Sequence, residues 1–264
     1  MTPVQDNTDG TRMRTEFSEN ARRRLASDRF RPLYHFLPPA NWMNDPNGLM
    51  TWKGTYHLFY QHNPEQAVWG KIHWGHARSN DLMHWTDLPL ALAPTPGSHD
   101  RDGVWTGCGV DDNGTPTLVY TGRYGEKESV CLATSLDDLV TWEKHPDNPI
   151  ISTAPEGLDL HAFRDPFIWS EGNQRYLVIG GGEVEKGGVA LLYRAKDMHH
   201  WEYVGPLLAS GSVDYGSAWE CPNVFRFGEK HALIFSEMGQ GRAVYFAGTF
   251  NGMHLISEAS GEVD

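Results

Sequence analysis

The sequence predicts an all-β protein of the β-propeller class. A segment that ends in an acid, a hydrophobe and then a tryptophan occurs three times, with Trp85, Trp142 and Trp201 spaced 57 and 59 residues apart. An alternating apolar run of strand type precedes each tryptophan, and no segment shows sustained helical periodicity. Units of roughly 45–60 residues with about four short strands each are typical of propeller blades. A β-sandwich is the alternative, but it would not explain the repeated ending.

The individual strands and turns can be assigned from these repeats. Four alternating runs of β-branched and aromatic residues are predicted strands: 55–63, 115–123, 174–182 and 230–238. Each run follows a short stretch rich in Gly, Asn and Asp that is typical of a hairpin turn: 52–54, 111–114, 170–173 and 227–230. We expect the three repeated tryptophans to lie in the core between blades rather than in a binding site.

The N-terminal residues 1–30 differ in composition from the rest of the chain. They are polar, contain no apolar block of signal-peptide type, and are expected to be partly disordered with one helical turn around Arg22–Arg24. Residues 31–264 are predicted to form the catalytic propeller domain. The missing signal and the small, odd number of three cysteines favour a cytoplasmic protein without a disulfide framework.

Charge and spacing also exclude several kinds of partner. The net charge of −12 disfavours nucleic acid, and no apolar run is long enough to cross a membrane. The 13 histidines show no metal-ligand spacing, so neither a metal nor another cofactor is expected. A neutral substrate fits this charge better, and the abundant aromatic residues are compatible with sugar binding as well as with a β-rich core.

Three acids open predicted blades, and we expect them at equivalent positions. Asp45 lies in "WMNDPNG", Asp165 in "FRDPFIW" beside Arg164, and Glu220 in "WECPNVF". Each one alone is better explained as a turn or capping residue. Because inner strands of a propeller converge on one axis, the three together predict a shared pocket, where clustered negative charge costs stability unless it is needed. Paired carboxylates about 5 Å apart are what retaining glycoside hydrolysis requires, and Arg164 would keep the third acid ionised.

These motifs resemble glycoside hydrolase family 32, which contains invertases, levanases and inulinases. The ordered set "WMNDPNG", "FRDP" and "WECP" is specific, although "RDP" alone is not. Further similarity lies in "HLFYQHNP" (57–64), "WGHARSNDLMHW" (74–85) and "VWTGCGV" (104–110), and it extends from about residue 31 to the C-terminus.

The resemblance implies a five-bladed propeller followed by a C-terminal β-sandwich. About four blades are expected in this chain, and the sandwich is expected to be absent. Asp45 would be the nucleophile, Glu220 an acid/base kept protonated by an enclosed site, and Asp165 a transition-state stabiliser. The resemblance also places six residues in the fructosyl pocket: Asn44, Gln61, Trp69, Trp105, Thr106 and Arg164. Thr106 stands where the family usually has serine and keeps its hydroxyl.

The sequence leaves other interpretations open. A non-catalytic sugar-binding propeller would lack one of the three acids, and a related arabinan- or xylan-cleaving enzyme would lack this set of motifs. Hydrolysis and fructosyl transfer share the covalent intermediate, so sequence does not separate them, nor sucrose from inulin or levan. Oligomeric state is equally open. Four blades alone would leave an open edge, for which we expect poor solubility or lost activity.

Overall fold

The computed structural model describes residues 20–32, 34–212 and 215–263, which form four antiparallel four-stranded sheets. We call them blades one to four. Blade one contains β1 (Trp42–Trp52), β2 (Thr55–Asn63), β3 (His73–Ser79) and β4 (Thr86–Leu92). Blade two contains β5 (Gly103–Asp112), β6 (Thr115–Tyr124), β7 (Lys127–Thr134) and β8 (Glu143–Lys144). Blade three contains β9 (Leu160–Glu171), β10 (Gln174–Glu183), β11 (Gly187–Ala195) and β12 (Glu202–Ala209). Blade four contains β13 (Trp219–Phe227), β14 (Lys230–Glu237), β15 (Arg242–Phe250) and β16 (Leu255–Val263).

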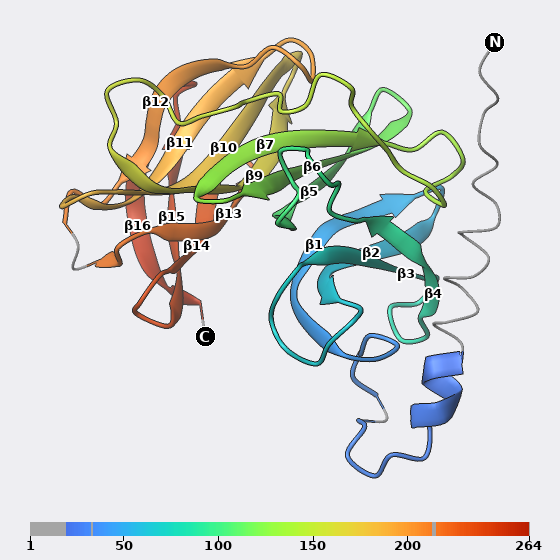
Figure 1. Cartoon of the computed structure of the whole chain (residues 1–264). Coiled ribbons are helices and arrows are strands. Elements are labelled where there is room, and N and C mark those ends of the chain that lie inside the picture. The colour runs from blue at the N-terminus through green and yellow to red at the C-terminus, as the bar shows by residue number, and fades with distance from the viewer. Residues whose placement is uncertain (1–19, 33, 213–214, 264) are drawn as a thin grey trace.

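The blades are arranged as a β-propeller, as the sequence predicts. Within each blade the strands pair in chain order, and the first strands pack side by side, β1 on β5, β5 on β9 and β9 on β13. Figure 1 shows the four sheets following one another from blade one in blue to blade four in red. Residues 20–25 form the expected helical turn, and no helix in the described ranges is long and apolar enough to span a membrane.

The predicted strands and turns are confirmed. The four runs correspond to β2, β6, β10 and β14 to within one residue at either end. The turns before β2 and β6 have positive φ at both central residues, Lys53–Gly54 and Asn113–Gly114, which is the geometry of tight hairpins whose twist matches the flanking strands.

Alternating side chains of each middle blade fill two cores. On β6, Leu118 and Tyr120 belong to the cluster between blades one and two, whereas Val119 belongs to the cluster between blades two and three. A third cluster, which contains the buried Trp219, joins blades three and four. Because strand side chains alternate between the two faces, a sheet that is buried on both sides reads as a nearly continuous apolar run.

Each repeated tryptophan packs against the part of the chain that precedes its own blade. Trp142 of blade two meets Phe59 of blade one edge-on at 5.5 Å, and Trp201 of blade three packs on the cluster shared with blade two. These two contacts confirm the predicted inter-blade position. Trp85 differs, because blade one is preceded by the N-terminal segment, and its ring packs on Phe36 of that segment at 5.6 Å.

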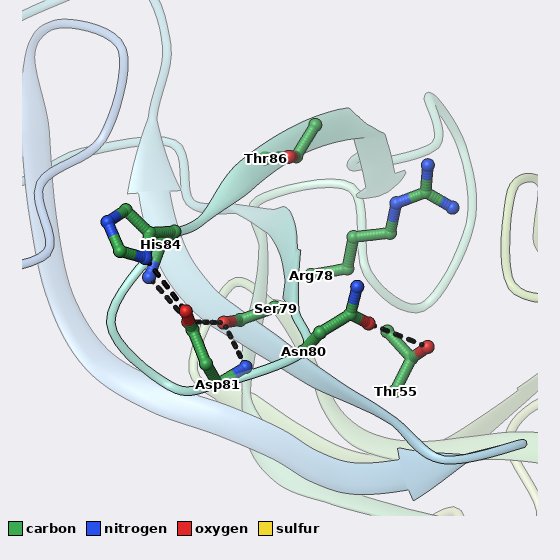
Figure 2. Close-up of a pocket in the computed structure, with 7 residues that line it drawn as sticks. All are labelled: Thr55, Arg78, Ser79, Asn80, Asp81, His84 and Thr86. Atoms are coloured by element: carbon green, nitrogen blue, oxygen red, sulfur yellow. Dashed lines mark hydrogen bonds and ion pairs between the residues drawn. The ribbon is translucent and has the colours of Figure 1, made fainter.

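An oxygen acceptor holds the turn before the last strand in three blades. In blade one, Asp81 Oδ1 accepts hydrogen bonds from the backbone N–H groups two and three residues further on, at 2.9 and 2.8 Å. Figure 2 shows the second of these contacts, from His84. Asp197 makes the same pair of contacts in blade three, and Asn251 makes it in blade four. The copy in blade four is hidden in the sequence because Asn251 replaces the acid and Leu255 replaces the tryptophan.

Blade one buries a histidine pair that matters for the pH dependence of stability. His76 is 1% exposed, its Nε2 lies 2.9 Å from His57 Nδ1, and the Phe59 ring stacks on it at 4.0 Å. Burial lowers the pKa of His76 well below its ordinary value, and the positive charges of His57 and Arg78 lower it further. Folding therefore requires the neutral imidazole.

Replacing this histidine should flatten the acid side of the stability curve. The unfolded chain takes up a proton at His76 near pH 6.5 while the folded protein does not, so stability is lost as the pH falls below about 6.5. One such proton corresponds to about 1.4 kcal/mol per pH unit. We expect His76→Gln to remove a slope of that size between pH 6.5 and 5.5 in urea unfolding, whereas the exposed His84→Gln keeps it. An unchanged slope in His76→Gln would contradict this assignment.

Candidate active site

The first strand of every blade carries a β-bulge at the axis. In each case the ladder skips, so that this strand has one residue more than its partner, at Asn44–Asp45, Thr106, Asp165–Pro166 and Cys221–Pro222. The sequence explains the bulges, because proline has no N–H for the ladder and occupies or follows the bulge in blades one, three and four. Blade two has Gly107 there, where a Cβ would lie 2.0 Å from the backbone oxygen of Val119.

Each bulge supplies two adjacent side chains to the site. The residue directly before the proline or glycine forms an inner layer, made of Asp45, Thr106, Asp165 and Cys221. The residue before that forms an outer layer, made of Asn44, Trp105, Arg164 and Glu220. Glu220 is therefore equivalent to Arg164 rather than to the two aspartates, which corrects the expectation that the three acids share one position.

The nine residues predicted for the site all line one pocket of about 460 Å³. Cys221, Ser236 and Met238 complete its wall. A second cavity of about 390 Å³ is lined by the inner layer but not by the outer layer. The inner layer is therefore the floor of the pocket and separates it from this second cavity.

Asp45 is oriented by neighbouring donors. Its Oδ2 accepts from the Thr106 hydroxyl at 2.7 Å and from Gln61 Nε2 at 3.2 Å, while its Oδ1 accepts from Asn44 Nδ2 at 3.1 Å. Trp42 in turn donates its indole N–H to Asn44 Oδ1 at 3.0 Å. The Thr106 hydroxyl therefore donates a hydrogen bond to Asp45, and the three donors together fix the orientation of the Asp45 carboxylate.

Asp165 is the most enclosed of the three acids. It is 5% exposed, its backbone adopts φ +62°, and its Oδ2 accepts from the backbone N–H of Cys221 at 2.9 Å. Burial raises the pKa of Asp165 to about 7, against the lowering effects of the Cys221 hydrogen bond and the Arg164 charge. The expectation that Arg164 keeps this acid ionised is therefore wrong in its net effect: near pH 7 the carboxyl is about half protonated.

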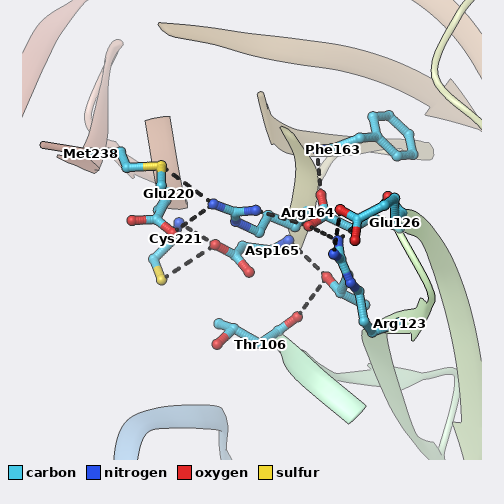
Figure 3. A network of polar contacts seen from close by, with 11 residues as sticks. Thr106, Arg123, Glu126, Phe163, Arg164, Asp165, Glu220, Cys221 and Met238 are labelled. Atoms are coloured by element: carbon cyan, nitrogen blue, oxygen red, sulfur yellow. Dashed lines mark hydrogen bonds and ion pairs between the residues drawn. The ribbon is translucent and has the colours of Figure 1, made fainter. Parts of the chain in front are cut away.

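Arg164 pairs with the acid of the next blade instead. Its Nη2 donates to Glu220 Oε1 at 3.0 Å and also contacts the Met238 sulfur at 3.5 Å (Figure 3). The Glu220 side chain is 34% exposed, so it is less enclosed than the sequence analysis supposed. The enclosure expected around Glu220 is found around Asp165, and Glu220 lies where a leaving group could reach it from solvent.

Comparison with known proteins decides the family. The model of the glycosyl hydrolases family 32 N-terminal domain matches residues 35–263. The chain belongs to glycosyl hydrolase family 32. It is 40% identical to an Escherichia coli sucrose-6-phosphate hydrolase over 89% of this chain and 50% of that protein. It is 39% identical to the Escherichia coli raffinose invertase, with the same coverage. The solved structure of a Bombyx mori GH32 beta-fructofuranosidase superposes with a TM-score of 0.85 at 33% identity, covering 98% of this chain and 57% of the other.

This family 32 chain spans about half the length of the curated relatives that it matches. Within the described residues, no group of three or more His, Cys, Asp or Glu side chains is placed to hold a metal ion. The carboxyl groups of the site are instead occupied by protein donors, as described above.

Sequence reasoning missed several contributors to this family 32 site. Cys221 acts through its backbone: it adopts φ +51°, which directs its N–H to Asp165. Ser236 and Met238 come from β14 and the turn after it, where no repeated motif marks them. Thr121 lies on β6 and is fully buried, yet it links two bulges: its Oγ1 donates to the Thr106 carbonyl at 3.0 Å and accepts from the Asp165 N–H at 2.8 Å.

Removing the Thr121 hydroxyl should weaken the link between blades two and three. Thr121→Val leaves the buried Asp165 N–H without its acceptor, which costs about 1–3 kcal/mol. Thr121→Ser keeps the hydroxyl, so its free energy of unfolding should fall clearly less than that of Thr121→Val. Urea unfolding of both variants measures the difference, and equal losses would show that the hydroxyl has no special role.

Neutralising Asp165 should stabilise the fold at alkaline pH. Because its folded pKa is raised above the unfolded value, the folded protein holds more protons between about pH 4 and 7, and stability falls as the pH rises through that window. Three pKa units correspond to about 4 kcal/mol, which is an upper bound for the gain of Asp165→Asn at pH 8. Unfolding at pH 4 should show little gain. A variant that is destabilised at pH 8 would contradict the assignment.

Proposed function

We propose that this chain carries the catalytic propeller of a retaining β-fructofuranosidase. The observation that carries the proposal is the convergence of Asp45, Asp165 and Glu220, from three different blades, on one pocket of about 460 Å³. Burial, with a smaller contribution from the charges of Glu220 and Asp45, raises the pKa of Asp165, and perturbed pKa values of this kind are typical of active sites. The family supplies independent support, because its matched relatives are named as sucrose-6-phosphate hydrolases and invertases.

The proposed reaction proceeds in two steps with two carboxyl groups. In the first step Glu220 donates its proton to the glycosidic oxygen while Asp45 attacks C2 of the fructosyl unit, so that the glycosidic bond breaks and an ester forms. In the second step Glu220 takes a proton from water, whose oxygen attacks C2 and releases Asp45. Two inversions at C2 give net retention.

The remaining residues would hold the fructosyl unit in place. Asp45 is aimed by Asn44, Gln61 and Thr106, so its attack needs little reorganisation. Asp165, with a pKa near 7, is suited to exchange hydrogen bonds with sugar hydroxyls as donor or acceptor. Trp69 is 55% exposed and meets Trp105 at 6.1 Å, which provides an apolar wall for a sugar face.

The substrate class rests on the relatives. Solved structures at 33% identity include a Bombyx mori beta-fructofuranosidase mutant in complex with sucrose and a Cichorium intybus fructan 1-exohydrolase variant in complex with 1-kestose. We therefore propose terminal β-D-fructofuranosides as substrates. Hydrolysis is preferred to transfer because the matched relatives have hydrolase or invertase names.

Removal of either reacting carboxyl should abolish turnover without unfolding the protein. We expect Asp45→Asn and Glu220→Gln each to lower kcat by at least about 1000-fold on sucrose, because each deletes one partner of a two-step displacement. Fructose release from sucrose, sucrose 6-phosphate, inulin and levan is the measurement, with urea unfolding as the check on folding. Near-normal rates in either folded variant would overturn the proposal.

A further inference from the structure

We propose that Glu128 is a positioning residue of this site: it holds Arg164 against Glu220 and braces the Trp105 wall through Arg123. Glu128 lies at the start of β7, in blade two, within the charged stretch "EKES" that sequence alone would place in solvent. The catalytic part of this inference rests on the proposed function, because it concerns the acid/base role of Glu220.

Glu128 is a buried carboxylate whose two oxygens are both occupied. Its side chain is only 4% exposed. Oε1 accepts from Arg164 Nη1 at 2.8 Å and from Arg123 Nη1 at 3.0 Å, while Oε2 accepts from the backbone N–H of Phe163 at 2.7 Å. A buried charge is kept only where it is paired and hydrogen-bonded, and Glu128 meets both conditions with two cations and one amide.

The guanidinium of Arg164 is fixed between two acids. Nη1 points to Glu128 and Nη2 points to Glu220, so the planar group bridges them across two blade boundaries. Figure 3 shows the contact with Glu220. Burial lowers the pKa of Arg164, but the charges of Glu128, Asp165 and Glu220 raise it by more than burial lowers it. The guanidinium therefore stays charged. Glu128 is thus the rigid side of a bridge whose other side is the acid/base.

The second cation extends the network to the aromatic wall. Arg123 lies over the Trp105 ring at 4.9 Å, and Arg164 lies 5.8 Å from the same ring. Arg123 also pairs with Glu126, whose side chain is 99% exposed. One buried carboxylate therefore ties the orientation of Glu220 to the position of Trp105, whereas Glu126 offers an exposed ion pair on the same arginine.

A glutamine at position 128 cannot reproduce these contacts. Its one oxygen can serve either the two guanidinium groups or the Phe163 amide, and its NH₂ group would then face a donor on the other side. Glu128→Gln therefore breaks the bridge while keeping the size of the side chain. Glu126→Gln removes a charge from the same arginine at the surface and is the matched control.

The kinetic test compares these two variants on sucrose. We expect Glu128→Gln to lower kcat by about 100-fold with KM changed less than about threefold, since a displaced acid/base impairs the transition state more than ground-state binding.

The outcomes separate a positioning role from a merely structural one. Glu126→Gln should keep kcat and KM. If Glu128→Gln only reduces the folded fraction and leaves kcat per folded molecule unchanged, Glu128 is a tie between blades two and three and the proposal is wrong. Partial recovery of kcat in Glu128→Asp, which restores the charge, would support it.

A measurement independent of turnover tests the bridge itself. In protein labelled with ¹⁵N-arginine, the guanidinium signals of Arg164 and Arg123 should be protected from exchange, and Arg164→Lys assigns the first of them. Protection should be lost in Glu128→Gln and kept in Glu126→Gln and Asp45→Asn. Unchanged protection in Glu128→Gln would overturn the inference. Near-normal turnover in folded Asp45→Asn, together with lost protection in Glu128→Gln, would refute the proposed function and leave the bridge standing.

Discussion

A proline or glycine stands at the β-bulge in the innermost strand of every blade, and the pocket depends on it. Pro46, Pro166 and Pro222 lack the N–H that the ladder needs, and Gly107 leaves room where the backbone of β6 approaches. A regular strand sends consecutive side chains to opposite faces, whereas a bulge re-aims them. Each blade can therefore direct two neighbouring residues to one axis while the rest of its ladder stays intact.

The second constraint is electrostatic, and it binds the blades to one another. Arg164 and Glu220 come from adjacent blades and form an ion pair. Glu128, from a third blade, forms a second ion pair with the other terminal nitrogen of the Arg164 guanidinium. Asp165 accepts hydrogen bonds from an amide and a thiol, and its burial raises its pKa despite the nearby charge of Arg164. The site therefore holds one acid that is costly to ionise. Burial of apolar side chains in the cores between blades stabilises the fold and offsets this cost.

The sequence predicted what is local and missed what depends on neighbours. Strand runs, hairpin turns and the three acids that open blades are patterns of adjacent residues, so the fold class and a pocket shared by these acids followed from them. The other six pocket residues were predicted from the resemblance to family 32. The partner of Arg164, the pKa of Asp165 and the burial of Glu128 depend on the neighbouring blade, which no local pattern encodes. Trp85 shares its motif with Trp142 and Trp201 but not its environment, because a different segment precedes blade one.

The bulges also separate the task of folding from the task of chemistry. The proline or glycine sets the backbone, and the residue directly before it has no ladder partner in any of the four blades. Four equivalent slots hold an amide, an indole, a guanidinium and a carboxylate in the outer layer, and two carboxylates, a hydroxyl and a thiol in the inner one. A scaffold of this kind can change its reactivity one slot at a time without being refolded, so new specificities are within reach of single substitutions.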